Sequence, residues 1–148
     1  MTSRATLAQI RFGTGLRPGR RLPAPETLME RLTGPDRVAR TYPLEDFAAR
    51  AVAAQTYLSE LRASRGLADG AERQAAARAL MRNAKSRQLA ISLARGVASE
   101  DGLRERLTWF WADHFTTAGQ RAVMQGSITA YVEEAIRPHV AGRFGDML

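Results

Sequence analysis

Apolar side chains recur every three or four positions along much of the chain, which is the spacing of one face of an α-helix. A clear case is the segment from Leu44 to Gly66, whose apolar positions are Phe47, Ala51, Ala54, Leu58 and Leu61. Strand-favouring residues are scarce, since the chain has 6 Val and 4 Ile against 26 Ala. The pattern therefore predicts an all-α fold, a helical bundle of about five to six helices.

Glycine and proline divide the first part of the chain. A short helix is expected over residues 6–11 and a second over residues 25–32, which begins on a proline. Between them, residues 12–24 are rich in glycine and proline and are expected to form a loop. The second helix should end at Gly34 and Pro35.

The longest predicted helix begins after Asp69 and runs to Val97. Asp69 and Glu72 have the spacing of a capping box, in which two side chains satisfy free N–H groups at a helix start. The apolar positions of this helix are few and mostly small: Ala77, Leu80, Ala84, Ile91, Ala94 and Ala98. Ser99 is expected to cap the next helix, over residues 101–115.

The last part of the chain is expected to hold a loop and one interrupted helix. The polar residues 116–126 form the predicted loop, and Ser127 begins the helix. Pro138 lacks an N–H group and should kink or restart that helix.

Near the carboxyl end, Glu133 or Glu134 has the spacing to pair with Arg137 on one helix face. The chain then ends on three apolar residues with no capping residue after them: Phe144, Met147 and Leu148. Helix ends and apolar faces both need partners. We therefore expect residues 1–148 to form a single helical domain that is the front portion of a larger one.

Composition adds a strong positive charge. The chain carries 22 Lys and Arg residues against 15 Asp and Glu, a formal net charge of +7. The densest basic part, residues 73–95, suggests an anion or nucleic-acid site that includes Arg73, Arg78, Arg82, Lys85, Arg87 and Arg95. Among these, Arg78, Arg82 and Lys85 are the candidate anion-binding residues. The same segment has no aromatic residue on which a base could stack, so a solvated basic face is favoured over nucleic-acid binding.

The residue types present exclude several kinds of site. Because the chain has no cysteine, it has no disulfide, no thiolate zinc site and no cysteine nucleophile. Its 2 histidines cannot supply a three-histidine metal site. No run reaches the roughly 18 apolar residues of a membrane span. The amino end lacks the apolar centre of a secretory signal, which predicts a cytoplasmic location.

The segment RLTWFWADHF holds the main candidate for chemistry. Its spacing places His114 on one helical stripe with Leu103, Leu107 and Phe110. In one interpretation, His114 is a metal ligand or a general base. In the other, it is a core histidine whose nitrogens are satisfied by backbone groups or a carboxylate.

The second histidine, His139, follows Pro138 and lies five residues after Glu134. It could join His114 in a site of two histidines and one carboxylate. His114 and His139 are therefore candidate catalytic residues, and with Glu134 they are candidate metal ligands. Because nothing in the spacing requires a metal site, we predict no cofactor.

Two familiar catalytic motifs are absent. The turn Gly13-Thr14-Gly15 lacks the preceding strand and the full glycine pattern of a phosphate-binding loop. No serine lies in the Gly-x-Ser-x-Gly pattern of a nucleophile elbow.

Three stretches together resemble a known bacterial family. RFGTGLRPG is similar to the family's opening turn, and LRERLTWFWADHF is similar to one of its helices. In that helix the matching residues are Arg106, Phe110, Trp111, His114 and Phe115. In the third stretch, YVEEAIRPHVAGRFGDML, the matching residues are Tyr131, Arg137, Pro138, His139, Gly142, Phe144 and Leu148. The family is called domain of unknown function 1800.

The resemblance implies a mostly helical bacterial protein of unestablished activity. Ala112 and Asp113 stand where many members carry His-Asn, and members continue into a segment rich in Asn, Glu and His that this sequence lacks. Genes of the family often neighbour those of domain of unknown function 1501, whose members resemble exported sulfatase-like proteins. The resemblance thus implies a protein partner from that second family and an envelope association through it.

Three functions remain as alternatives. The favoured one is a scaffold or partner-binding module of a larger protein. The second is the amino-terminal part of a metal-assisted, hydrolase-like enzyme. The third is an anion or nucleic-acid binder that uses the Arg-rich helix.

Overall fold

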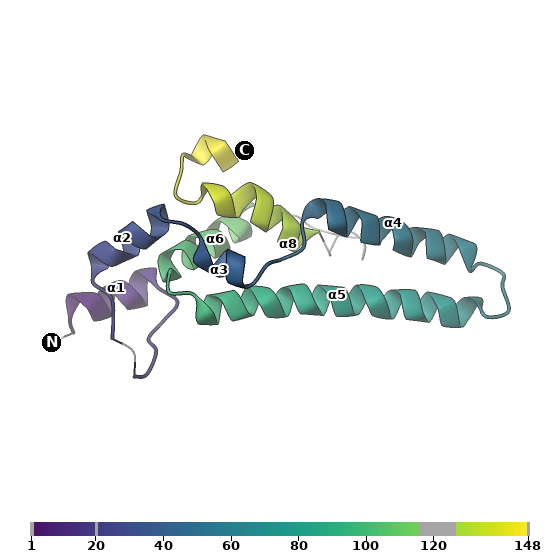
Figure 1. Cartoon of the computed structure of the whole chain (residues 1–148), viewed down its shortest axis with the longest axis horizontal. Coiled ribbons are helices and arrows are strands. Elements are labelled where there is room, and N and C mark those ends of the chain that lie inside the picture. The colour runs from purple at the N-terminus through teal and green to yellow at the C-terminus, as the bar shows by residue number, and fades with distance from the viewer. Residues whose placement is uncertain (1, 20, 116–126, 148) are drawn as a thin grey trace.

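The computed structural model describes residues 2–19, 21–115 and 127–147, and every regular element in these ranges is a helix (Figure 1). The predicted all-α fold is confirmed. The α-helices are α1 (Arg4–Phe12), α2 (Pro25–Thr33), α3 (Arg37–Thr41), α4 (Phe47–Ala63), α5 (Gly70–Ala98), α6 (Gly102–His114) and α8 (Ile128–Tyr131). Short π- and 3₁₀-helical segments follow: η1 (Val132–Ile136), η2 (Arg137–His139) and η3 (Phe144–Met147). No helix in the described part of the chain is both long and apolar enough to cross a bilayer.

The helices form two regions. α4 and α5 pack side by side as a long helical hairpin, which we call the arm (Figure 1). The other helices gather at the carboxyl-terminal end of α5, and we call this region the head. α8 and η1 lie where the two regions meet, because α8 contacts both α4 and α5.

Side-chain caps set the starts of most helices. Ser3, Asp36, Asp46 and Asp101 each accept a hydrogen bond from the N–H three residues later. The prediction that Ser99 caps α6 is therefore wrong by two residues. Ser99 instead accepts a hydrogen bond from the N–H of Asp101, at 3.1 Å, and thereby orients the residue that caps α6.

Two further local features differ from what the sequence pattern indicates. The capping box at Asp69 does not form, because the Asp69 side chain makes no cap hydrogen bond at the start of α5. α3 was not expected at all, since a helix of five residues is too short to show an apolar repeat. The predicted loop 116–126 lies outside the described residues, whereas the other predicted helices are present with ends shifted by a few residues.

The final helix is interrupted, as Pro138 predicts. The chain passes from α8 through the π-helical turns of η1 to the 3₁₀ turn of η2, which contains Pro138. The expected pairing of Arg137 with Glu133 or Glu134 is wrong. Glu133 instead pairs with Arg95, and Glu134 accepts a hydrogen bond from the N–H of Phe47, at 2.5 Å. The irregular turns therefore direct both carboxylates toward the arm.

The hydrophobic core of the head is small. Leu32, Ile136 and Val140 are buried, and partly buried residues pack around them: Leu103, Leu107, Trp111, Ala112, Phe115, Tyr131 and Val132. This cluster joins α2, α6 and the chain from α8 to η2.

A charged network lies beside this core. Arg137 donates to both carboxylate oxygens of Glu105, at 2.5 and 3.2 Å, and to both of Asp36, at 2.6 and 3.2 Å. Glu105 is only 1% exposed and Arg137 is also buried. The network therefore ties α6 to η2 and to the residue that caps α3.

Arginines also cap the carboxyl ends of helices from other helices. Arg104 donates to the carbonyls of Arg31, Leu32 and Gly34 at the end of α2, and Arg106 donates to two carbonyls at the end of α1. The last carbonyls of a helix have no partners within it, and the helix dipole makes that end negative. A guanidinium satisfies both requirements, so these contacts fix the packing of α1 and α2 on α6.

The predicted apolar stripes are partly wrong. On α5, Leu80 is 71% exposed and Ala98 is exposed, whereas Gln88 and Arg95 are buried. On α4, Phe47 and Leu58 are exposed and Arg50 is buried. The reason is the same in each helix: a polar side chain with a partner elsewhere in the fold takes an inward position, as Arg95 does with Glu133 and the carbonyl of Tyr42.

We predict that Glu105→Gln lowers the free energy of unfolding by about 3 kcal/mol, because it leaves the buried Arg137 with one carboxylate instead of two. Urea unfolding monitored by circular dichroism measures the change. The matched control is Glu26→Gln, which breaks an exposed ion pair with Arg4 and should cost under about 0.5 kcal/mol. Equal losses of unfolding free energy in the two variants would show that the buried network does not stabilise the head.

A second prediction concerns the stability of the fold at low pH. Burial acts to raise the pKa of Asp36, but hydrogen bonds from Arg137 and the N–H of Ala39, together with the charges of Arg137 and Arg104, outweigh it and lower the pKa below its ordinary value of 3.8. A lowered folded pKa stabilises the fold above the unfolded pKa, and this stabilisation is lost as the pH falls through the folded one.

The free energy of unfolding should therefore decrease below about pH 4. Asp36→Asn, which keeps a capping side chain at the start of α3, should make this decrease shallower. Urea unfolding at a series of pH values between neutrality and strong acid tests this. Identical pH profiles for the parent and the variant would contradict it.

Candidate functional site

His114 lies exposed at the end of α6. Its ring stacks with Phe110 at a centroid distance of 6.4 Å and meets Trp111 and Phe115 edge-on, at 5.5 and 5.1 Å. The interpretation of His114 as a core histidine is therefore wrong. The reason is its place in the helix: Leu103 and Leu107 on the same stripe pack against the core, whereas His114 is the last residue of α6 and lies beside the exposed Phe110.

The second histidine, His139, is half-buried in η2, and Glu134 is exposed and bonded to the N–H of Phe47. Within residues 2–19, 21–115 and 127–147, no group of three or more His, Cys, Asp or Glu side chains could hold a metal ion. A catalytic or metal-binding role for His114, His139 and Glu134 stays a prediction.

The three stretches that carry the family resemblance meet in the head. Gly102 packs so closely on the loop after α1 that a Cβ there would lie 2.9 Å from the backbone nitrogen of Thr14. Arg106 caps α1 and Glu105 binds Arg137, while the ring of Phe144 stacks on Phe115 and makes a tilted contact with Trp111. Many of these residues therefore position helices.

Sequence reasoning missed the partners in this network. Arg137 lies 32 positions from Glu105 and 101 positions from Asp36. Separations of this size leave no local spacing to detect. The available signal is indirect: many arginines lie within the predicted helices.

The basic candidates on α5 divide into two groups. Arg78, Arg82, Lys85 and Arg87 are exposed, and an anion-binding role for them stays a prediction. Arg73 is held by Glu60, with Nε and Oε1 2.7 Å apart, and Arg95 is buried against Glu133. The last two are therefore structural, which corrects their assignment to an anion-binding surface.

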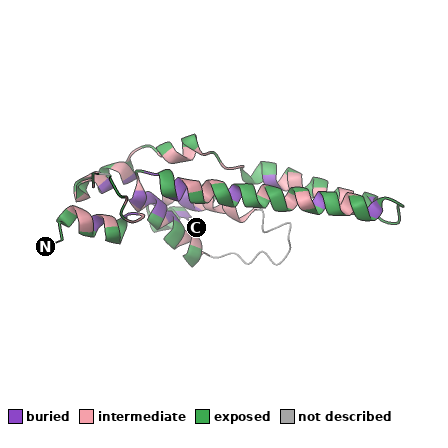
Figure 2. Ribbon diagram, turned by 90° about the horizontal axis from the view of Figure 1, so that it is seen from below, coloured by how far each residue is buried: buried purple, intermediate pink, exposed green. Residues whose placement is uncertain are grey.

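The exposed basic residues share one side of α5 with an apolar stripe. Leu89, Leu93 and Val97 follow one another at intervals of four and are 54%, 60% and 75% exposed. At about 100° per residue, Arg78, Arg82 and Lys85 precede them on the same side. We call these six residues the outer face of α5. Exposed residues recur along the arm in Figure 2.

Trp109 extends the apolar end of this surface. Its indole ring lies directly over Gly96, where a Cβ would come within 2.5 Å of Cζ2. The ring remains 46% exposed. Because Gly96 lies three residues after Leu93 and just before Val97, the indole borders the outer face of α5.

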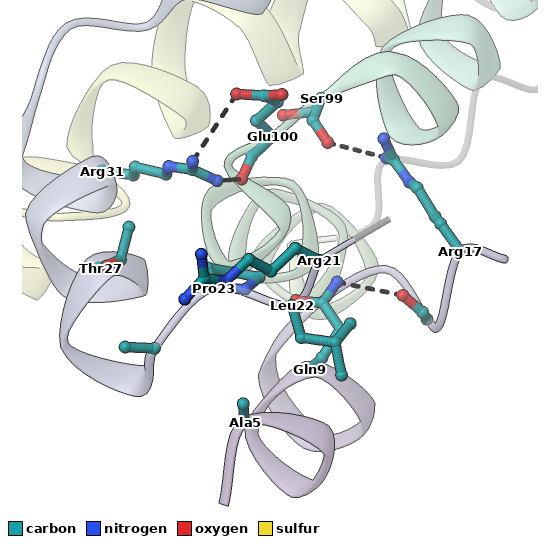
Figure 3. A pocket seen from close by; sticks show the side chains of 12 residues that line it. Ala5, Gln9, Arg17, Arg21, Leu22, Pro23, Thr27, Arg31, Ser99 and Glu100 are labelled. Carbon is teal, nitrogen blue, oxygen red and sulfur yellow. Dashed lines mark hydrogen bonds and ion pairs between the residues drawn. The ribbon is translucent and has the colours of Figure 1, made fainter. Parts of the chain in front are cut away.

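The head also contains two adjoining cavities of about 510 and 550 Å³. They share the turn between α5 and α6, with Ser99 and Glu100, and the α2 residues Thr27 and Arg31. The first cavity extends toward α1 and the loop after it (Figure 3). The second extends toward α3 and has a mixed lining that includes the carboxylates of Asp36 and Asp101.

Comparison with known proteins gives one match. The sequence profile of the family described as protein of unknown function (DUF1800) matches residues 8–148, nearly the whole chain. Neither a curated protein nor a solved structure matches the chain.

The contact between Gly96 and Trp109 can be tested by Gly96→Ala. The added Cβ must displace the indole ring, because a distance of 2.5 Å is far below van der Waals contact. We expect the tryptophan emission maximum to move to longer wavelength as the ring enters solvent. The control is Gly145→Ala, whose Cβ meets nothing within 4 Å. An unchanged spectrum in Gly96→Ala would contradict the packing.

Proposed function

The chain belongs to the family described as protein of unknown function (DUF1800), and from this premise we propose that it is a helical scaffold that binds a partner through the outer face of α5. The observation that carries the proposal is the exposure of Leu89, Leu93 and Val97 in one row. Burying an aliphatic side chain contributes about 1.5–3 kcal/mol. A row of exposed apolar side chains on a protein surface supports an interaction site there.

Charge indicates what kind of partner fits. Arg78 donates a hydrogen bond to the neutral side chain of Gln74, and neither Arg78 nor Arg82 has an ion pair with a described carboxylate. A partner that covers the apolar row therefore also meets uncompensated positive charge in the preceding turns of α5. The complementary partner is an acidic amphipathic helix, with apolar residues on one stripe and carboxylates beside them.

The other functions considered above have less support. Stacking of nucleic-acid bases would need aromatic residues near the basic turns, and α5 has none between Gly70 and Ala98. A hydrolytic function would need a group of acids and histidines, which the described residues do not form. A partner from domain of unknown function 1501 stays a prediction of the family resemblance.

The test is the binding of a synthetic acidic amphipathic peptide to the full chain, measured by isothermal titration calorimetry. Leu93→Glu should weaken binding at least tenfold, because it removes an apolar contact and places a carboxylate opposite those of the peptide. Leu and Glu have similar helix propensities, so α5 should remain intact.

The matched control is Leu80→Glu, which changes another exposed leucine about half a turn around α5 from Leu89. It should bind the peptide as the parent does. A peptide whose carboxylates are replaced by lysines should bind weakly. Equal weakening by Leu80→Glu, equal affinity for the lysine peptide, or no binding of the acidic peptide would each refute the proposal.

A further inference from the structure

The first cavity of the head gathers three arginines. Arg17 and Arg21 come from the loop between α1 and α2, and Arg31 comes from α2 itself. The lining of the cavity also includes one carboxylate, that of Glu100. In Figure 3, Arg21 lies across the middle of the view, with no dashed line to the residues drawn around it. The charge of this lining is therefore positive.

Two of the three guanidinium groups are held in place by neutral backbone groups. Arg17 Nη2 donates to the carbonyls of Ser99 and Gly96, at 2.8 and 3.4 Å. Arg31 Nη1 donates to the carbonyl of Glu100 at 2.6 Å, and its Nη2 lies 3.6 Å from the carboxylate of the same residue. A guanidinium has five N–H donors, so both arginines keep donors for a ligand.

Arg21 differs from both. It has no hydrogen bond or ion pair with any residue in the described ranges. It is exposed, and it lines the cavity beside Leu22 and Pro23. A charge with no partner among the described residues, in the same cavity as two positioned arginines, is suited to an anionic ligand.

The amino end of α2 reinforces the positive potential. Ala24 at the cap position has no side chain to accept a hydrogen bond, and Pro25 follows it. The first turn of α2 therefore lacks a side-chain cap, and the positive end of its dipole lies at the cavity, which Ala24 and Thr27 line.

Part of the lining is apolar. Ala5 from α1 and Leu22 and Pro23 from the loop contribute it. The cavity volume of about 510 Å³ falls within the range of roughly 300–1,000 Å³ for small-molecule sites. We infer that this cavity binds a small phosphate monoester, with the phosphate on Arg21 and Arg31 and the organic group against the apolar residues of the lining.

This site is chemically different from the phosphate-binding loop that the turn Gly13-Thr14-Gly15 first suggests. No strand precedes the turn in the described part of the chain, and guanidinium groups take the place of backbone N–H donors. Gly15 has a φ of +103°, a conformation that favours glycine, and it turns the loop so that Gly15 and Arg17 both line the cavity. The site shares no residue with the outer face of α5.

The experiment measures binding of glycerol 1-phosphate, inorganic phosphate and glycerol to the full chain by calorimetry at low salt. Glycerol 1-phosphate should bind, inorganic phosphate should bind more weakly because it lacks the organic group, and glycerol should not bind. Arg21→Gln should weaken binding of glycerol 1-phosphate about tenfold, which is typical for one charge-assisted hydrogen bond. Because Arg21 has no partner among the described residues, this variant should fold as the parent does.

The matched control is Arg82→Gln, which removes the same charge from the outer face of α5. It should leave the binding of glycerol 1-phosphate unchanged and should weaken the binding of the acidic peptide. The two proposals can therefore fail independently. Equal weakening by Arg21→Gln and Arg82→Gln would show a general charge effect and overturn the site. Binding of inorganic phosphate as tight as that of glycerol 1-phosphate, or no binding of glycerol 1-phosphate, would overturn it as well.

Discussion

The packing of the head depends on buried guanidinium groups. Leu32, Ile136 and Val140 alone bury too little apolar surface to order several short helices. Arg137 supplies the missing constraint, since it binds two carboxylates from distant parts of the chain with fixed geometry. Removing water from such charges is costly, so the arrangement is stable only when every partner is present. This requirement makes one helical packing much more favourable than its alternatives.

The same use of arginine explains the surface of the arm. Because Gln88 and Arg95 occupy inward positions of α5, leucines that would otherwise enter a core lie outside. α4 shows the same pattern, since Arg50 is buried and Phe47 is exposed. An ion pair between Glu60 of α4 and Arg73 of α5 joins the helices of the arm, and several of the larger apolar side chains of the arm are exposed. Its exposed row is thus a consequence of how the inside is built.

The two proposed sites lie in different regions and use different chemistry. The outer face of α5 combines apolar contact with long-range charge, which suits a partner helix. In the head cavity, backbone carbonyls position Arg17 and Arg31, while Arg21 has no partner within the described residues. Many of the residues that carry the family resemblance, including Arg106 and Arg137, act between these sites as the contacts that join helices. This separation between residues that join helices and residues of the two proposed sites agrees with the proposal of a scaffold that carries a small-molecule site.

The sequence by itself determined the all-α class, the position of most helices and the break at Pro138, because each depends on neighbours a few residues apart. It also identified the exposed basic residues Arg78 and Arg82. Only the tertiary structure decided which faces are buried, because Glu105 is stable inside the fold only once Arg137, 32 positions away, reaches it. The cavity likewise exists only when the loop after α1 closes against the end of α5. Such contacts depend on three-dimensional proximity, which local sequence spacing does not encode.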